Sequence, residues 1–226
     1  MANLQDGGIP PSPPTVLLPC GGATVRARIE PSKATLRQRL RAERNALSEE
    51  RIRDLSASIA RRVLGASFFD EARTIGLYLP FDHEVDPSLL IHETVGSGRL
   101  VFLPVVDGAN RSMRFVPYQP GDPLQVGAYG IREPVVPPDG GQGLDTLDLD
   151  LLFQPLIGFD RAGGRLGFGG GYHDRALAAR GEATHPLCVG LAYAFQELPF
   201  LPREPHDILM DWVVTERGVV ACREYR

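Results

Sequence analysis

The stretch TIGLYLPFDHEVDPSLLIHETVGSGRLVFLPVV, residues 74–106, contains the unit that decides the fold. Its two ends, TIGLYLP and RLVFLPVV, are short, rich in β-forming side chains and bounded by turn residues, which is typical of strands. The segment between them, residues 86–96, is typical of a helix with Asp86 as its N-cap and Pro87 at its first helical position. Two strands separated by a helix favour parallel pairing.

The same alternation continues on both sides of this unit. Upstream, residues 31–64 have the periodicity of two helices, with Ser32 and Ser48 as their N-caps. Downstream, further β-rich segments occupy residues 113–118, 149–159, 186–195 and 211–216. We therefore expect an α/β fold with a mainly parallel sheet flanked by helices on both faces, in a Rossmann-like three-layer architecture.

The amino-acid composition is typical of a soluble protein, and the first 30 residues differ from the rest. Residues 1–30 are rich in Pro and Gly and show no periodicity, so we expect a flexible extension before a single domain at residues 31–226. No run approaches the roughly 18 apolar residues of a membrane helix, and the N-terminus lacks the basic start of a signal peptide. We expect a cytoplasmic monomer that does not bind membranes.

The charge is divided unevenly along the chain. The whole sequence has a formal net charge of -4, but residues 31–62 contain nine basic and four acidic residues, a net charge of +5. Residues 63–226 contain 13 basic and 22 acidic residues, a net charge of -9. A local cationic patch on an acidic protein indicates a small anionic ligand rather than a nucleic acid.

Residues 163–177, GGRLGFGGGYHDRAL, place a glycine-rich loop between a predicted strand and a predicted helix. Ligands of open α/β sheets bind beyond the strand ends. Glycines allow successive backbone N–H groups to converge on an anion, and a following helix N-terminus adds partial positive charge. The loop lacks the G-x-x-x-x-G-K-[ST] pattern of Walker-type loops. By itself it fits either phosphate binding or a plain turn.

Four basic residues of the first predicted helix form one stripe. Lys33, Arg37, Arg41 and Arg44 recur at positions i, i+4, i+8 and i+11. A bound polyanion would relieve the repulsion between them, although a solvated basic face is the common alternative. Of the 24 basic residues only Lys33 is a lysine, and a compact ammonium at the start of this helix favours contact with a phosphate.

The order of several short motifs resembles the 5-formyltetrahydrofolate cyclo-ligase family over about residues 32–220. The motifs are KATLRQRLRAER, YLPFDHEVD, LPVV, MRF, YGIREP, DLLFQPLIGFDRAGGRLGFGGGYHDR, VGLAYAFQ, LPREPHD and DWVVTE. The resemblance implies an enzyme that closes 5-formyltetrahydrofolate to 5,10-methenyltetrahydrofolate. It also implies ATP as co-substrate, Mg²⁺ as cofactor, and ADP and phosphate as products.

For the nucleotide side, the resemblance implies roles for individual residues. Lys33, Tyr172 and Asp174 would be catalytic. Asp174 and Asp207 would bind Mg²⁺ as hard oxygen ligands. The ATP-binding residues would be Lys33, Arg37, Arg165, Leu166, Gly167, Phe168, Gly169, Gly170, Gly171, Tyr172 and His173.

For the folate side, the resemblance implies that Glu84 accepts hydrogen bonds from the pterin ring. Phe168 and Tyr172 would also contact the substrate, with Tyr129 as a further packing partner. His173 departs from the family pattern, which most often has Tyr-Tyr before the aspartate. If His173 lies beside the reacting groups, its titration would make catalysis pH-dependent between roughly pH 6 and 8, whereas a packing residue would not.

Two other functions fit part of these residues. A paralogue of the same fold could bind nucleotide or folate without turnover, and a kinase could use the same ATP site for another small acceptor. None of the polar residues with an implied role is missing, which favours the cyclo-ligase because a decaying site should have lost some. A kinase would give Glu84 no specific role.

Overall fold

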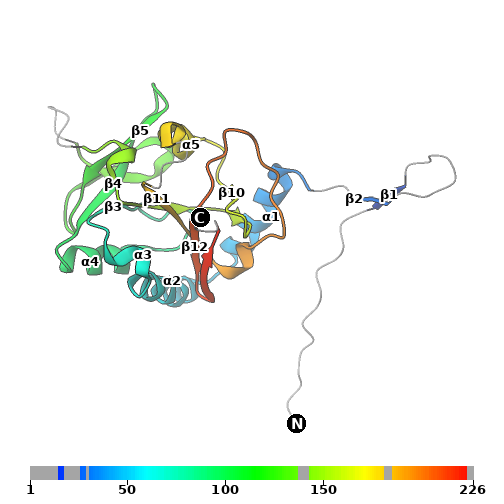
Figure 1. Ribbon diagram of the computed structural model, residues 1–226, viewed down its shortest axis with the longest axis horizontal. Coiled ribbons are helices and arrows are strands. Elements are labelled where there is room, and N and C mark those ends of the chain that lie inside the picture. The colour runs from blue at the N-terminus through cyan, green and yellow to red at the C-terminus, as the bar shows by residue number, and fades with distance from the viewer. Residues whose placement is uncertain (1–14, 18–25, 29–30, 137–142, 181–184, 223–226) are drawn as a thin grey trace, which may run out of the picture.

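Strands and helices alternate along the chain as the sequence predicts (Figure 1). The computed structural model describes residues 15–17, 26–28, 31–136, 143–180 and 185–222. Its strands are β1 (Thr15–Leu17), β2 (Arg26–Arg28), β3 (Thr74–Gly76), β4 (Leu100–Asp107), β5 (Ser112–Pro117), β6 (Leu124–Val126), β7 (Arg132–Pro134), β8 (Leu151–Pro155), β9 (Gly158–Phe159), β10 (Arg165–Leu166), β11 (Leu187–Leu191), β12 (Trp212–Thr215) and β13 (Gly218–Ala221). Its helices are α1 (Lys33–Asn45), α2 (Glu49–Leu64), α3 (Ser67–Asp70), α4 (Ser88–Gly96) and α5 (Tyr172–Ala176), with short 3-10 turns η1 (Ala128–Gly130), η2 (Thr146–Asp148), η3 (Ala178–Arg180) and η4 (Ala194–Gln196).

The central sheet has seven strands in the order β13-β12-β11-β8-β3-β4-β5. The five inner strands, from β12 to β4, pair in parallel with one another. The two edge strands, β13 and β5, pair antiparallel with their neighbours. The prediction of a mainly parallel sheet is therefore confirmed.

Both faces of this sheet are covered, so the predicted three-layer arrangement is also confirmed. On one face, Ile59 of α2 and Leu90 of α4 belong to the same buried core as Ile75 and Phe153 of the sheet. On the other face, α5, η2 and the connecting segments cover a second core. In Figure 1, α2, α3 and α4 lie on one side of the sheet and α5 lies on the other.

Helix α1 packs beside the sheet rather than on either face. Ser32 caps it by accepting the backbone N–H of Thr35, as predicted. Its buried face, Leu36 and Leu40, contacts the region of the β9–β10 pair through a separate small core. This packing brings the basic stripe of α1 next to the loop that follows β10.

Two element boundaries differ from the sequence prediction. The segment 149–159 is not one strand, because β8 ends at Pro155, which has no N–H to continue the ladder, and β9 turns away to pair with β10. Helix α4 begins at Ser88 rather than at Pro87, while the Asp86 carboxylate accepts the Ser88 N–H at 2.9 Å. The β6–β7 hairpin and the edge strand β13 were not predicted.

Of the predicted extension, only β1 and β2 lie within the described residues, where they pair antiparallel. The rest of residues 1–30 lies outside the described residues, so the flexibility of this segment stays a prediction. Within the described ranges, no helix is both long and apolar enough to cross a membrane.

Candidate active site

A cavity of about 550 Å³ lies near the carboxyl ends of β3 and β8, beside the loop between β10 and α5. This volume is in the usual range for a small-molecule site, and the position at the strand ends is where open α/β sheets bind ligands. Every residue with an implied role in binding or catalysis lines this one cavity. They are Lys33, Arg37, Glu84, Arg165, Leu166, Gly167, Phe168, Gly169, Gly170, Gly171, Tyr172, His173, Asp174 and Asp207.

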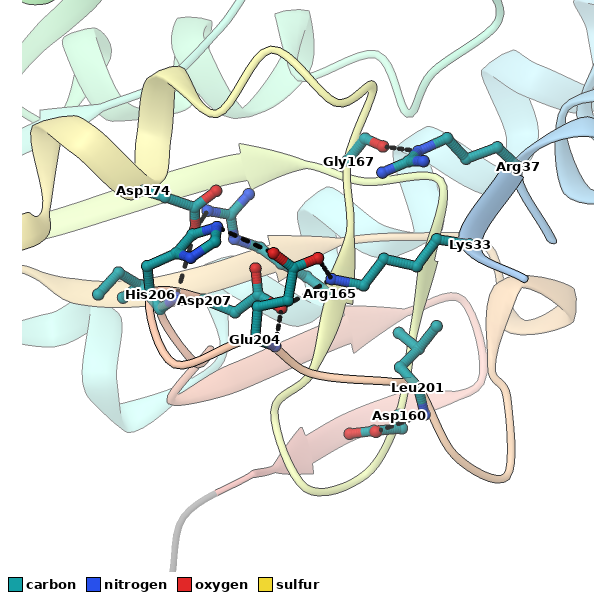
Figure 2. Close-up of polar contacts among 11 residues, drawn as sticks. Lys33, Arg37, Asp160, Arg165, Gly167, Asp174, Leu201, Glu204, His206 and Asp207 are labelled. Atoms are coloured by element: carbon teal, nitrogen blue, oxygen red, sulfur yellow. Dashed lines mark hydrogen bonds and ion pairs between the residues drawn. The ribbon is translucent and has the colours of Figure 1, made fainter. Parts of the chain in front are cut away.

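The glycine-rich loop, residues 167–171, forms one wall of the cavity. Gly169 has φ +99° and Gly171 has φ +66°, a backbone conformation that favours glycine. Arg37 Nε donates a hydrogen bond to the Gly167 carbonyl oxygen at 2.8 Å, which ties α1 to the loop (Figure 2). Helix α5 has only five residues, so its N-terminus contributes less partial charge than the sequence suggested. The loop N–H groups remain the main backbone donors.

Lys33, the first residue of α1, lies between two carboxylates of the segment after η4. Its Nζ is 2.9 Å from Asp207 Oδ2 and 3.2 Å from Glu204 Oε1 (Figure 2). Burial opposes the positive charge, but the hydrogen bonds to Asp207 and Glu204 outweigh it and raise the pKa of Lys33. Burial likewise disfavours charge on Asp207, yet the Glu204 backbone N–H and Lys33 lower the pKa of that carboxyl. Both groups are therefore charged near neutral pH.

Arg165 and Asp174 form a second ion pair in the same wall. Arg165 Nη2 is 2.5 Å from Asp174 Oδ1, and the guanidinium side chain is only 8% exposed. The Ile208 backbone N–H donates to the same oxygen at 3.2 Å, which links α5 to the segment that carries Asp207. Arg165 Nε is buried and has no hydrogen-bond partner in the described part of the chain.

Asp160 fixes the two segments that carry these ion pairs. Its buried carboxylate accepts the backbone N–H groups of Gly164 at 2.8 Å and Leu201 at 3.0 Å. Arg203 Nη2 donates to the same carboxylate at 3.0 Å. A Cβ atom at position 164 would lie 2.9 Å from Asp160 Oδ2, so Gly164 is required by this contact. The start of the glycine-rich segment is thus fastened to the LPREPHD segment.

The carboxylates of this wall fit the chemistry of Mg²⁺ without forming a complete site. Asp174 uses Oδ1 and Asp207 uses Oδ2 in the contacts above, and carboxylate oxygens are the hard donors that Mg²⁺ prefers. Within the described residues, no group of three metal-ligating side chains is clustered closely enough to hold a metal. Mg²⁺ is commonly held by one or two carboxylates together with substrate phosphates, and these two residues match that arrangement.

Glu84 lies on the opposite side of the cavity, in the turn between β3 and α4. It is 5% exposed, and its Oε2 accepts the Phe81 backbone N–H at 3.1 Å. Burial raises the pKa of Glu84 to about 7, against the opposing effects of Arg44 and the Phe81 N–H. A buried carboxyl that lines a cavity and titrates near neutrality is a strong candidate for a functional group.

Tyr172 and His173 begin α5 at the edge of the cavity. The Tyr172 hydroxyl is 3.1 Å from the Tyr129 hydroxyl, so the β6–β7 hairpin, whose tip carries Tyr129, contacts the loop. Burial, together with the nearby Arg165, lowers the pKa of His173 to about 3. A neutral imidazole at pH 6–8 argues against an effect of its titration on catalysis in that range, and the role of His173 stays a prediction.

The basic stripe of α1 reaches the cavity only with its first half. Lys33 and Arg37 line the cavity, whereas Arg41 and Arg44 are both bound to Asp82. A single polyanion in the cavity therefore does not contact all four basic residues of the stripe. Sequence reasoning also assigned no role to Glu204, although this carboxylate is part of LPREPHD and its charge three residues before Asp207 was a usable signal.

Comparisons with known proteins agree with this site. A sequence model of the 5-formyltetrahydrofolate cyclo-ligase family matches residues 29–216. The chain is 34% identical to the 5-formyltetrahydrofolate cyclo-ligase of Escherichia coli strain K12 over 182 residues, which are 80% of this chain and 98% of the relative. It is 33% identical to that of Haemophilus influenzae over 172 residues, which are 76% of this chain and 89% of the relative. The solved structure of Aquifex aeolicus 5,10-methenyltetrahydrofolate synthetase matches with a TM-score of 0.73 and 36% identity, over 86% of this chain and 94% of that one. Sequence, fold and cavity together therefore assign this chain to the 5-formyltetrahydrofolate cyclo-ligase family.

Proposed function

We propose that this protein uses ATP and Mg²⁺ to convert 5-formyltetrahydrofolate to 5,10-methenyltetrahydrofolate, with release of ADP and phosphate. Membership of the family supports the conversion of the folate. The observation that supports the ATP-dependent form of the reaction is the shared cavity. Its one wall combines cations, bare loop backbone and carboxylates, and its other side carries the buried carboxyl of Glu84.

The reaction requires an activated oxygen, because the oxygen of an amide-like formyl group is a poor leaving group. Transfer of the γ-phosphoryl group of ATP to that oxygen gives a phosphorylated intermediate and ADP. The neighbouring exocyclic nitrogen of the folate then attacks the formyl carbon, and the carbon–oxygen bond breaks to release phosphate. Phosphoryl transfer depends mainly on positioning and on neutralising the charge of the phosphates.

The cationic wall fits this demand. Lys33, Arg37 and Arg165 supply positive charge, and the N–H groups of residues 167–171 supply neutral donors. Mg²⁺, held by Asp174 and Asp207, would neutralise further phosphate charge. Lys33 and Arg165 are paired with carboxylates, so phosphates bound at this wall would share or replace these carboxylate partners.

The opposite side of the cavity fits the folate. An ionised Glu84 carboxylate can accept hydrogen bonds from ring N–H groups of the pterin, and its burial excludes competing water. Phe81 and Phe168, whose ring centroids are 6.2 Å apart, offer aromatic surface beside it. Tyr172 lines the same cavity as Phe168 and Asp174, which suits a residue that contacts both substrates.

The proposal is tested by incubating the purified protein with ATP, Mg²⁺ and 5-formyltetrahydrofolate and following the near-ultraviolet absorbance of the methenyl product. We expect product only when all three are present, together with one ADP for each methenyl group formed. Asp174→Asn should remove nearly all turnover, because a neutral amide is a poor Mg²⁺ ligand, while a circular dichroism spectrum like that of the wild type shows that it folds.

The same assay separates the two alternatives. A non-catalytic paralogue would bind ATP or folate in calorimetry without forming either product. A kinase for another acceptor would release ADP without the methenyl absorbance. Either result would overturn the proposal.

A further inference from the structure

The turn that carries Glu84 has an unfavourable backbone. Asp82 has φ +51° and His83 has φ +60°, so two successive residues other than glycine are left-handed. Side chains disfavour this conformation, and such residues persist only where the surroundings hold them in place. Because Glu84 follows directly, the contacts that hold this turn also determine where its carboxyl group points.

Arg44 holds the turn from inside the protein. Its side chain is 1% exposed, and its Nη2 donates to Asp82 Oδ2 at 2.8 Å. Its Nε and Nη1 are buried without a hydrogen-bond partner in the described residues. Replacing a buried ion pair by apolar side chains is often neutral or stabilising, so stability alone gives little reason for an arginine here.

A second contact fixes the backbone of the turn. The hydroxyl of Tyr193, which is fully buried, donates to the carbonyl oxygens of His83 at 3.3 Å and Glu84 at 3.1 Å. The turn is therefore held at its side chain by Arg44 and at its backbone by Tyr193. These contacts come from α1 and from the segment after β11, which are far apart in the sequence.

The guanidinium groups of Arg44 and of its neighbour Arg41 also contact Phe168 of the glycine-rich loop. The Cζ atoms of Arg41 and Arg44 lie 5.4 Å and 5.5 Å from the ring centroid of Phe168, within the range of a cation–π interaction. Phe168 belongs to the glycine-rich loop and, with Phe81, offers aromatic surface to the folate, and Asp82 belongs to the turn that carries Glu84. Arg44 thus touches both the loop and the turn without lining the cavity.

We infer that Arg44 is a positioning residue, which holds the Asp82 turn so that the Glu84 carboxyl group faces the folate. The inference rests on the proposed function, because it assumes that Glu84 meets the substrate. The inference goes beyond that function because it assigns a role to a residue outside the cavity. It also predicts that loss of Arg44 affects folate binding more than ATP binding.

The test compares variants at one ion-paired cluster. Arg44→Met removes the buried cation, and Asp82→Asn removes the negative charge of its partner while keeping a residue that tolerates the left-handed backbone. Arg41→Met is the matched control: Arg41 lies on the same helix and binds the same Asp82 oxygen at 2.9 Å, but it is 44% exposed. The measurements are KM for folate, KM for ATP and kcat, with melting temperature as a check on folding.

We expect Arg44→Met to raise KM for folate by about tenfold or more, the order expected when a hydrogen bond to a charged group is lost. KM for ATP should change less than threefold, and Arg41→Met should change both by less than threefold, because exposed ion pairs contribute little. Asp82→Asn should raise KM for folate in the same direction. The double variant should be no worse than Arg44→Met, because the two residues act through one contact.

The pH dependence of kcat/KM for folate is a further test. It should not change if Arg44 only stabilises the fold. The charged and titratable groups that face Glu84 are Arg44, Asp82, Tyr78 and Tyr193. Burial raises the pKa of Tyr78 well above its ordinary value and that of Tyr193 to about 12, so both are neutral in the assay range. Loss of Arg44 should move the acid limb of kcat/KM for folate to higher pH, and Asp82→Asn should move it to lower pH.

Failure of this inference is distinct from failure of the proposed function. Wild-type turnover tests the function, and the ratios of variant to wild type test Arg44. If the wild type binds folate without turnover, calorimetric Kd values replace KM, and a wild type that binds no folate overturns both. Equal losses for folate and ATP, an equal effect of Arg41→Met, or acid limbs that do not move in opposite directions would overturn the role of Arg44. If Arg44→Met does not fold, Asp82→Asn decides.

Discussion

Replacement of Glu84 by glutamine should increase stability at alkaline pH while reducing activity. Burial raises the pKa of Glu84 from 4.5 to about 7 in the folded protein, while the unfolded chain keeps the ordinary value. Between these two values the folded state binds more protons than the unfolded state, so stability falls as pH rises. The full difference corresponds to about 3 kcal/mol that is present below pH 4.5 and lost above pH 7.

The assay is chemical denaturation of the wild type and Glu84→Gln at pH 5 and pH 8. Glutamine does not titrate, and the other ionisable groups are common to both proteins, so the difference between the two free energies of unfolding isolates Glu84. That difference should shift by about 2 to 3 kcal/mol in favour of the variant between pH 5 and pH 8. A difference that is the same at both pH values would refute the argument that Glu84 is buried and protonated in the folded protein.

The same carboxyl group should control use of the folate. For the wild type, kcat/KM for 5-formyltetrahydrofolate should fall as pH falls below about 7, because the protonated group has lost its negative charge and accepts hydrogen bonds less strongly. Glu84→Gln should lack this limb and should be about 10- to 150-fold less active at pH 8, which corresponds to the 1.5–3 kcal/mol of a hydrogen bond to a charged group. A variant that is stabilised yet fully active would separate Glu84 from substrate binding.

Three further predictions concern the opposite wall and its support. Lys33→Ala should weaken ATP binding in calorimetry by about 1.5–3 kcal/mol and folate binding much less, because it removes a charge-assisted hydrogen bond to phosphate; equal losses would contradict this. His173→Tyr should leave the shape of the turnover profile between pH 6 and 8 unchanged, because a pKa of about 3 keeps the imidazole neutral, and a profile that changes shape would show that His173 titrates there. Asp160→Ala should lower the free energy of unfolding in urea by about 3–5 kcal/mol, because Arg203 and three backbone N–H groups lose a buried acceptor; a loss below 1 kcal/mol would show that the contacts of Asp160 are replaceable.

Local signals in the sequence predicted the α/β fold class, and motif order predicted most of the charged residues that line the cavity. The strand–helix–strand pattern at residues 74–106 depends on side-chain periodicity, which one segment displays by itself. The N-caps Ser32 and Ser48 likewise depend on neighbouring backbone only. Motif order then identified the cavity residues, because a family keeps such residues in order even where the segments between them vary.

Properties that arise between distant segments were not predictable in this way. Arg41 and Arg44 continue the helical stripe of Lys33 and Arg37, but only the fold determines that Asp82 lies opposite Arg41 and Arg44. The pKa of His173 depends on burial by residues that are remote in sequence and on Arg165. A sequence gives the charge of a side chain, whereas its protonation and its partners depend on packing.

The ion pairs of the cationic wall have a consequence for how ATP and Mg²⁺ bind. If ATP and Mg²⁺ bind here as proposed, ATP without Mg²⁺ would compete with Asp207 and Glu204 for Lys33 and with Asp174 for Arg165, because both cations are paired with carboxylates. A Mg²⁺ ion bound by Asp174 and Asp207 would weaken these ion pairs and leave the two basic side chains to the phosphates. ATP and Mg²⁺ should therefore bind cooperatively, and each should tighten the other by the same factor.

The charge of Asp207 provides the test of this exchange. Asp207→Asn weakens the competitor for Lys33, so Mg²⁺-free ATP should bind this variant more tightly than the wild type. In the presence of Mg²⁺ the order should reverse, because the variant would lack one of the two proposed Mg²⁺ ligands. Calorimetry of ATP binding with Mg²⁺ and with EDTA measures both affinities for both proteins. If Asp207→Asn weakens ATP equally in the two conditions, Asp207 does not compete for Lys33, and the ion pair with Lys33 is not an obstacle that the nucleotide must displace.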